Sequence, residues 1–117
     1  MLPPSVRIFV CTTPQDLRRS FDGLSARVAE ILGQDARSAG GLYVFVNKRA
    51  NRAKVLWWEK NGYCLLYKRL HKAIFRLPSA GAAGATSVQI DARALAALLE
   101  GAARAPRAPR LDLGSAA

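Results

Sequence analysis

Cations crowd into the middle of this chain, around the stretch NKRANRAKVLWW at residues 47–58. Residues 48–76 contain nine lysines and arginines and a single acid, Glu59, so nine positive charges less one negative charge leave +8. Such a cluster can bind phosphates, because lysine and arginine neutralise them and release their counterions. An ordinary solvated face mixes both signs, whereas this ratio leaves a repulsion that an anion would relieve. The sequence therefore favours a polyanion as ligand over a merely solvated hairpin loop.

Ten basic side chains are candidates for contacts with a nucleic acid backbone. Eight lie within residues 48–76. The other two, Arg18 and Arg19, belong to the first predicted helix and either extend the basic surface or only solvate that helix. Contacts of this kind set affinity and position rather than sequence preference. The candidates are Lys48, Arg49, Arg52, Lys54, Lys68, Arg69, Lys72, Arg76, Arg18 and Arg19.

Aromatic residues next to these cations have two interpretations. The exposed faces of Trp58, Tyr63 or Tyr67 could stack on unpaired bases, as aromatic side chains do in proteins that bind single strands. Half of the 117 residues are hydrophobic, and a small domain needs its aromatic side chains to bury enough apolar surface. Packing in the core is therefore the favoured role for these rings.

Groups suited to catalysis are few. His71 is the only histidine and falls in a predicted turn, LHKA. Asp16, Asp22 and Glu30 lie on one predicted helix, but their spacings of six and eight do not bring them together on a metal. The sequence also lacks a glycine-rich phosphate loop and a serine in a nucleophile motif. We therefore predict no catalytic residue, no metal and no cofactor. On this basis, we expect that the protein is not an enzyme.

The predicted elements form one domain of the α+β class. We expect a small, mainly antiparallel sheet with an N-terminal helix packed on it and a short C-terminal helix. The first helix should begin at Thr13-Pro14 and stop at Gly33, while Asp91 should cap the last helix, which ends near Gly101. Branched and aromatic runs predict strands at 6–11, 42–46, 54–58, 63–70, 74–77 and 88–90.

The pair Asn61-Gly62 is the strongest hairpin signal in the chain. With this pair at the centre of the turn, Trp58 lies opposite Leu65, and the two tryptophans face opposite sides of the sheet. Both faces of the sheet are then apolar. Each must be covered by helices of this chain or by a partner.

Composition divides the chain into four parts. We expect a core domain at 1–78, a flexible linker at 79–87, a strand and helix that extend the core at 88–101, and a disordered basic tail at 102–117.

Cys11 and Cys64 sit in apolar runs and are predicted to be buried free thiols. The sequence shows no signal peptide and no apolar run long enough for a bilayer, so we expect a soluble, cytoplasmic protein without a membrane partner.

Three segments carry a resemblance to a known family. DLRRSFDGL (16–24), LYVFVNKRANRAKVLWW (42–58) and YCLLYKRL (63–70) occur in the order seen in the TnpB accessory proteins, also called Orf-two-like proteins, of the insertion-sequence sixty-six family. The resemblance covers roughly residues 5 to 100 and includes LAALLEG (95–101). It implies a bacterial protein that supports DNA transposition beside a separate transposase. It implies no catalytic residue.

These observations lead to one functional hypothesis and one alternative. The hypothesis is a non-catalytic accessory factor that binds DNA through a basic β-hairpin surface, with the element's transposase and its other accessory protein as partners. The alternative is an assembly module that binds the transposase through the second apolar face, which carries Trp57, Val55, Leu66 and Cys64, and has no direct role on DNA.

Overall fold

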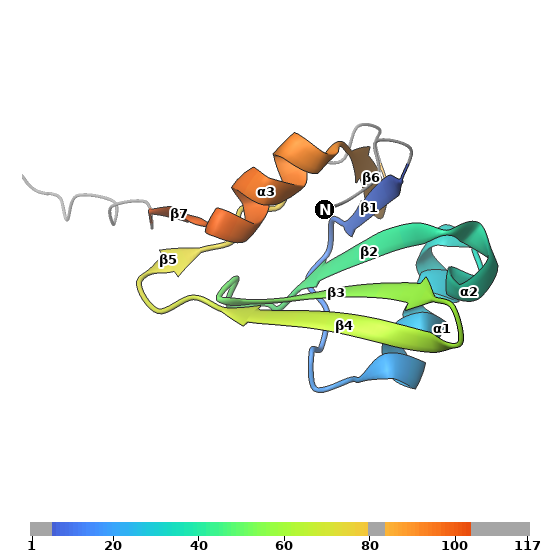
Figure 1. Cartoon of the computed structure of the whole chain (residues 1–117). Coiled ribbons are helices and arrows are strands. Elements are labelled where there is room, and N and C mark those ends of the chain that lie inside the picture. Colours follow the sequence, from blue (N-terminus) through green and yellow to red (C-terminus); the bar gives the residue numbers. More distant parts are fainter. Residues whose placement is uncertain (1–5, 80–83, 104–117) are drawn as a thin grey trace, which may run out of the picture.

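The computed structural model describes residues 6–79 and 84–103. Its main feature is a five-stranded sheet in the order β4-β3-β2-β1-β6 (Figure 1). The strands are β1 (Arg7–Cys11), β2 (Gly41–Val46), β3 (Arg52–Glu59), β4 (Gly62–Arg69) and β6 (Ser87–Ile90). β1 pairs in parallel with β2, and the other three pairings are antiparallel.

The fold is a mixed α/β arrangement, which differs in one respect from the predicted α+β class. The chain enters the sheet with β1, and the first helix, α1 (Phe21–Leu32), follows it as part of a crossover to β2. A crossover of this kind is what allows two consecutive strands to run in parallel. The mixed pairing was therefore not expected from the strand pattern alone.

Both faces of the sheet are covered, because successive residues of each strand point to opposite sides. On one face, Leu24 and Val28 of α1 share a buried cluster with Tyr43 and Phe45 of β2. On the other, Val44 lies in a cluster with residues of α3 (Ala92–Glu100). Figure 1 shows α3 on one side of the sheet and α1, with the short α2 (Ala36–Ala39), on the other.

The first helix begins later than predicted. Residues 12–20 form a loop instead, in which the Gln15 N–H donates to the Val46 carbonyl at 2.9 Å and the Asp16 carboxylate accepts from the Arg18 N–H at 3.0 Å. Side-chain bonds of this type compete with helix formation. Leu17 is buried without being helical. The helix stop was predicted correctly, because Gly33 has φ 65° and ends α1.

The β3–β4 hairpin turns at Lys60-Asn61 rather than at Asn61-Gly62. Glu59 pairs with Gly62, and Lys60 adopts the positive φ of 55°. Trp58 therefore lies opposite Tyr63, with the rings edge-on at 4.9 Å between centroids. The partner of each residue moves by two positions, so the predicted assignment of side chains to faces still holds.

The end of the described chain differs from the prediction in several places. The strand expected at 74–77 is only β5 (Ala73–Ile74), and it pairs with β7 (Ala102–Ala103), which begins the predicted tail. Helix α2, which was not predicted, forms between α1 and β2. Asp91 caps α3 as predicted, accepting from the Ala94 N–H at 2.8 Å. Residues 104–117 of the predicted tail and 80–83 of the predicted linker lie outside the described residues.

Candidate nucleic acid interface

The loop between β2 and β3 is held in place by the side chain of Asn47. Its Oδ1 accepts from the backbone N–H groups of Asn51, at 3.1 Å, and Arg52, at 2.9 Å, while its Nδ2 donates to Asn51 Oδ1 at 2.8 Å. An asparagine that bonds the following backbone in this way stabilises a tight turn. Lys48 and Arg49 are exposed on this loop. The two cations are therefore presented by an ordered turn.

The same loop also accepts two backbone hydrogen bonds from the segment that follows β4. The Phe75 N–H donates to the Ala50 carbonyl at 2.7 Å, and the Leu70 N–H donates to the Asn51 carbonyl at 2.8 Å. Phe75 itself is 2% exposed and belongs to the core beneath α3. The position of the basic loop thus depends on Leu70 and Phe75, which lie beyond β4 in the chain.

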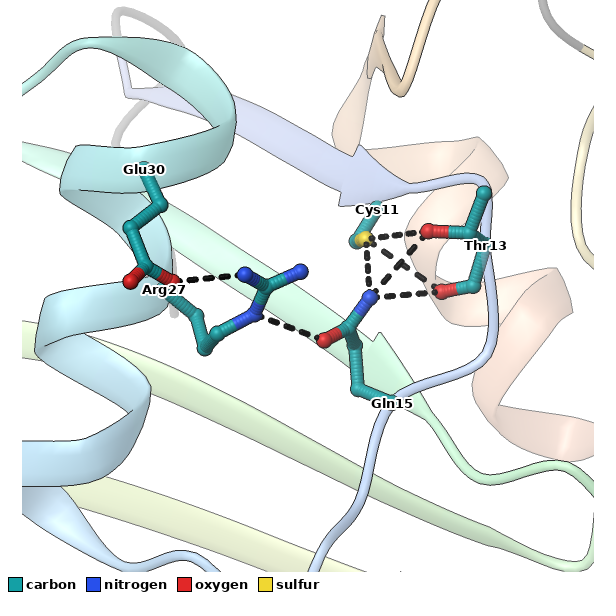
Figure 2. Close-up of polar contacts among 5 residues, drawn as sticks. All are labelled: Cys11, Thr13, Gln15, Arg27 and Glu30. Carbon is teal, nitrogen blue, oxygen red and sulfur yellow. Dashed lines mark hydrogen bonds and ion pairs between the residues drawn. The ribbon is translucent and has the colours of Figure 1, made fainter.

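A second loop, at residues 12–20, approaches from the end of β1. Gln15 organises it through a chain of polar contacts that Figure 2 shows. Its Nε2 donates to Cys11 Sγ at 3.3 Å, and its Oε1 accepts from Arg27 Nε at 2.9 Å. Arg27 in turn pairs with Glu30 on α1 at 2.6 Å. This chain of contacts ties the second loop to the helix behind it.

The two thiols are free, as predicted, but only one of them is fully buried. Cys11 is 2% exposed and takes part in the network around Gln15. Cys64 is half-buried on β4. This strand is at the edge of the sheet that the described residues form.

The two loops enclose an open cavity of about 490 Å³. Its walls include Gln15, Asn47, Asn51 and Tyr67 in addition to basic side chains. We call it the cationic cavity. It brings together five of the ten predicted contacts, which are Arg18, Lys48, Arg49, Arg52 and Lys54.

One of the five charges in the cavity is matched by an acid. Arg18 pairs with Asp16, 2.7 Å from its carboxylate, and the hydrogen bond from the guanidinium holds the pKa of that carboxyl well below its usual range. Asp16 is therefore ionised at neutral pH and balances Arg18. Lys48, Arg49 and Arg52 form no ion pair within residues 6–79 and 84–103.

Arg52 has a second cation beside it. It lies directly opposite Arg69 in the β3–β4 pairing, so both side chains point to the same face of the sheet. Like charges in directly opposed positions destabilise a sheet. Neither arginine has an acidic partner in the described part of the chain. This pair has the electrostatics expected of an anion site.

Lys54 has a different role from its neighbours. It is 8% exposed, its ammonium donates to the Arg19 carbonyl at 2.8 Å, and it lies 5.1 Å from the centroid of the Tyr67 ring. A buried ammonium must keep such partners to offset its lost hydration. Lys54 therefore joins the second loop to the sheet, and its charge faces the cavity from within the protein.

The remaining candidates do not join the cavity. The Lys68 ammonium donates to the carbonyl of Leu99, at the end of α3 on the opposite face, at 2.6 Å. Arg76 donates to the Ala103 carbonyl at 3.4 Å. Lys72 and Arg19 are exposed and do not line it. Helix α3 and β7, which position two of these cations, belong to the last part of the described chain.

The aromatic candidates separate in a similar way. The Tyr63 hydroxyl is within 2.7 Å of Ser25 Oγ, and its ring packs against Trp58. Both rings are partly buried. Tyr67 is 51% exposed and lines the cationic cavity. Trp58 and Tyr63 thus have a packing role, whereas the Tyr67 ring remains accessible.

Three polar residues of the site were not predicted, namely Gln15, Asn47 and Asn51. The two asparagines flank Lys48-Arg49-Ala50, and that spacing was a usable turn signal, because asparagine side chains bond their own backbone. Gln15 gave no comparable signal. Its role depends on Cys11 and Arg27, which tertiary structure brings to it.

Other sites are not apparent in the described residues. Within 6–79 and 84–103, no group of histidine, cysteine, aspartate and glutamate is placed to hold a metal ion. His71 is exposed in the turn that follows β4. No helix among the same residues is both long enough and apolar enough to cross a bilayer.

Replacing Asn47 by alanine should loosen the basic loop. The substitution removes three hydrogen bonds and leaves two backbone N–H groups without their acceptor, so we expect a loss of about 1–3 kcal/mol in unfolding free energy. Urea denaturation measures it. Asn61→Ala is the control, because Asn61 is exposed in the other turn. Equal stability of the two variants would contradict the role assigned to Asn47.

The fold and the site define a small, sheet-rich α/β protein that gathers unpaired cations on one end of its sheet. Residues 6–108 match the family described as IS66 Orf2 like protein, and the chain belongs to this family. The resemblance seen in the sequence is thereby confirmed. Membership indicates an accessory role in transposition.

Two relatives from Sinorhizobium fredii (strain NBRC 101917 / NGR234) are similar to this chain. The uncharacterized protein y4hO is 38% identical over 82 residues, which are 68% of this chain and 70% of the relative. The uncharacterized protein y4jC is 38% identical over 80 residues, which are 67% of this chain and 68% of the relative. No solved structure matches the chain significantly.

Proposed function

We propose that this protein supports transposition by binding the DNA phosphate backbone at the end of the sheet where the cationic cavity opens. The observation that carries the proposal is the opposed pair Arg52 and Arg69, next to Lys48 and Arg49, without acidic partners in the described residues. A bound phosphate would relieve this repulsion with charge-assisted hydrogen bonds. Because phosphates carry no sequence information, these contacts favour general DNA affinity over recognition of one sequence.

The cellular role follows from the family and from this ligand. An accessory protein of an insertion sequence that binds DNA would act beside the transposase, which performs the chemistry, and beside the element's other accessory protein. Element ends and target DNA both present the required phosphates. Binding of chromosomal DNA in a bacterium would place the protein in the cytoplasm.

Binding to DNA should depend on salt with a slope that reports the number of phosphate contacts. Four unpaired cations, Lys48, Arg49, Arg52 and Arg69, predict that log affinity falls against log salt with a slope of about −3 to −4. Fluorescence anisotropy with element-end and scrambled DNA across a salt series measures it, and the two sequences should bind alike. Absent binding, or binding that salt does not affect, would contradict the proposal.

An assembly role is a second candidate, favoured by one observation. On the face opposite α1, Val55 is buried in the cluster beneath α3, whereas Leu66 of the edge strand β4 is 41% exposed. The face proposed for a transposase contact is therefore reduced to the part around Leu66. Co-purification of the transposase with a variant that has lost DNA binding distinguishes the two roles, because a DNA-bridged association disappears with the DNA.

A further inference from the structure

We infer that the cationic cavity receives an unpaired nucleotide, with its phosphate on Arg49 and Arg52 and its base against the ring of Tyr67. The ligand is then single-stranded or locally opened DNA rather than an intact duplex. This inference rests on the proposed DNA binding and adds the form of DNA that the site selects.

The shape of the site is the first argument. A cavity of about 490 Å³ lies within the roughly 300–1,000 Å³ range of sites that enclose small ligands. An intact duplex presents a convex phosphate backbone and keeps the faces of its bases stacked inside. A nucleotide that has left the stack offers a phosphate, a sugar and a free base face that can enter such a hollow.

The position of Tyr67 is the second argument. It lies opposite Lys54 and on the same face of the sheet as Arg52 and Arg69. Tyr67 remains 51% exposed although the Lys54 ammonium lies 5.1 Å from its ring centroid. β4 is an edge strand, so no other strand of residues 6–79 and 84–103 pairs with its outer side. An accessible ring beside unpaired arginines is the arrangement that binds successive bases and phosphates of single strands.

A polar group is also available to the base. Asn51 lines the cavity, and its Oδ1 and backbone N–H are bonded to Asn47. Its Nδ2 has no hydrogen-bond partner among residues 6–79 and 84–103. That amide can donate to an acceptor on the base edge without disturbing the loop, since its other groups hold the loop in place.

The test compares three DNA probes with equal numbers of phosphates, a single strand, the same strand with abasic sites, and a duplex. Anisotropy at fixed salt should show the base-bearing single strand bound most tightly. Tyr67→Leu should weaken binding of that strand roughly 5- to 150-fold, the loss of one stacked base, and should leave the abasic strand and duplex nearly unchanged. Tyr67→Phe keeps the ring and should bind all three probes as the wild type does.

Each of three other outcomes would show that the inference is wrong. If the duplex is bound as tightly as the single strand and Tyr67→Leu changes neither, backbone binding stands and the inference is wrong. If Tyr67→Leu weakens all three probes equally, the ring supports the fold rather than a base, and the inference is again wrong. If the wild type binds none of the probes, the proposed DNA binding fails, and the inference fails with it.

Discussion

Replacing Arg49 and Arg52 together by glutamine is expected to lower affinity for DNA roughly 30- to 1,000-fold. Each arginine would lose a charge-assisted contact of about 1–2 kcal/mol with phosphate, and every 1.4 kcal/mol is a factor of about ten. The slope of log affinity against log salt should become shallower by about 2, because two fewer counterions are released. Anisotropy across a salt series gives both quantities from one set of titrations.

The matched control removes two charges elsewhere. Lys60, in the β3–β4 turn, and Arg93, on α3, are exposed and form no ion pair in the described residues. Lys60→Gln with Arg93→Gln changes the net charge by the same amount and should alter affinity only a few-fold through the overall field. If both double variants bind equally weakly, bulk charge and not the cavity controls binding.

Lys54 does not belong in this experiment, although the sequence grouped it with the other cations. Its ammonium is buried and bonded to the Arg19 carbonyl. Removing it would leave that carbonyl without a partner and destabilise the second loop. A loss of DNA binding in a Lys54 variant would therefore not distinguish a lost phosphate contact from a disturbed fold.

Phe75→Ala should lower the free energy of unfolding by about 3–5 kcal/mol. The ring is 2% exposed in the core beneath α3, and its removal leaves a cavity that the neighbouring strands cannot fully close. A loss of this size is a large part of the roughly 5–15 kcal/mol that stabilises an ordinary domain. Urea denaturation, monitored by tryptophan fluorescence, measures the free energy of unfolding.

Two further variants serve as controls for the Phe75→Ala result. Phe75→Leu keeps an apolar side chain of nearly the same reach and should lose less than about 1.5 kcal/mol. The Arg49 and Arg52 double variant should be at least as stable as the wild type, because neither side chain has an acidic partner in the described chain and loss of the Arg52 charge removes its repulsion with Arg69. If Phe75→Ala proves as stable as Phe75→Leu, the packing assigned to this ring is incorrect.

Local pattern was enough to predict much of the sheet. Alternation of side chains placed Trp57 and Trp58 on opposite faces, and this held even though the turn lies one residue earlier than expected. Gly33 and Asp91 were correctly predicted as helix boundaries, because the αL conformation and the N-terminal cap depend on the residue itself and its immediate neighbours. The concentration of positive charge was equally visible in the sequence.

The sequence by itself determined the strands of the five-stranded sheet, their apolar faces and the excess of cations, since each depends on the order of nearby residues. Only the tertiary structure decided which cations share a site. Lys54 turns inward to the Arg19 carbonyl, and Lys68 reaches α3 on the other face. Arg18 comes to the basic loop because the Gln15 N–H bonds to the end of β2. Contacts between distant segments depend on strand order and loop packing, which no local pattern encodes.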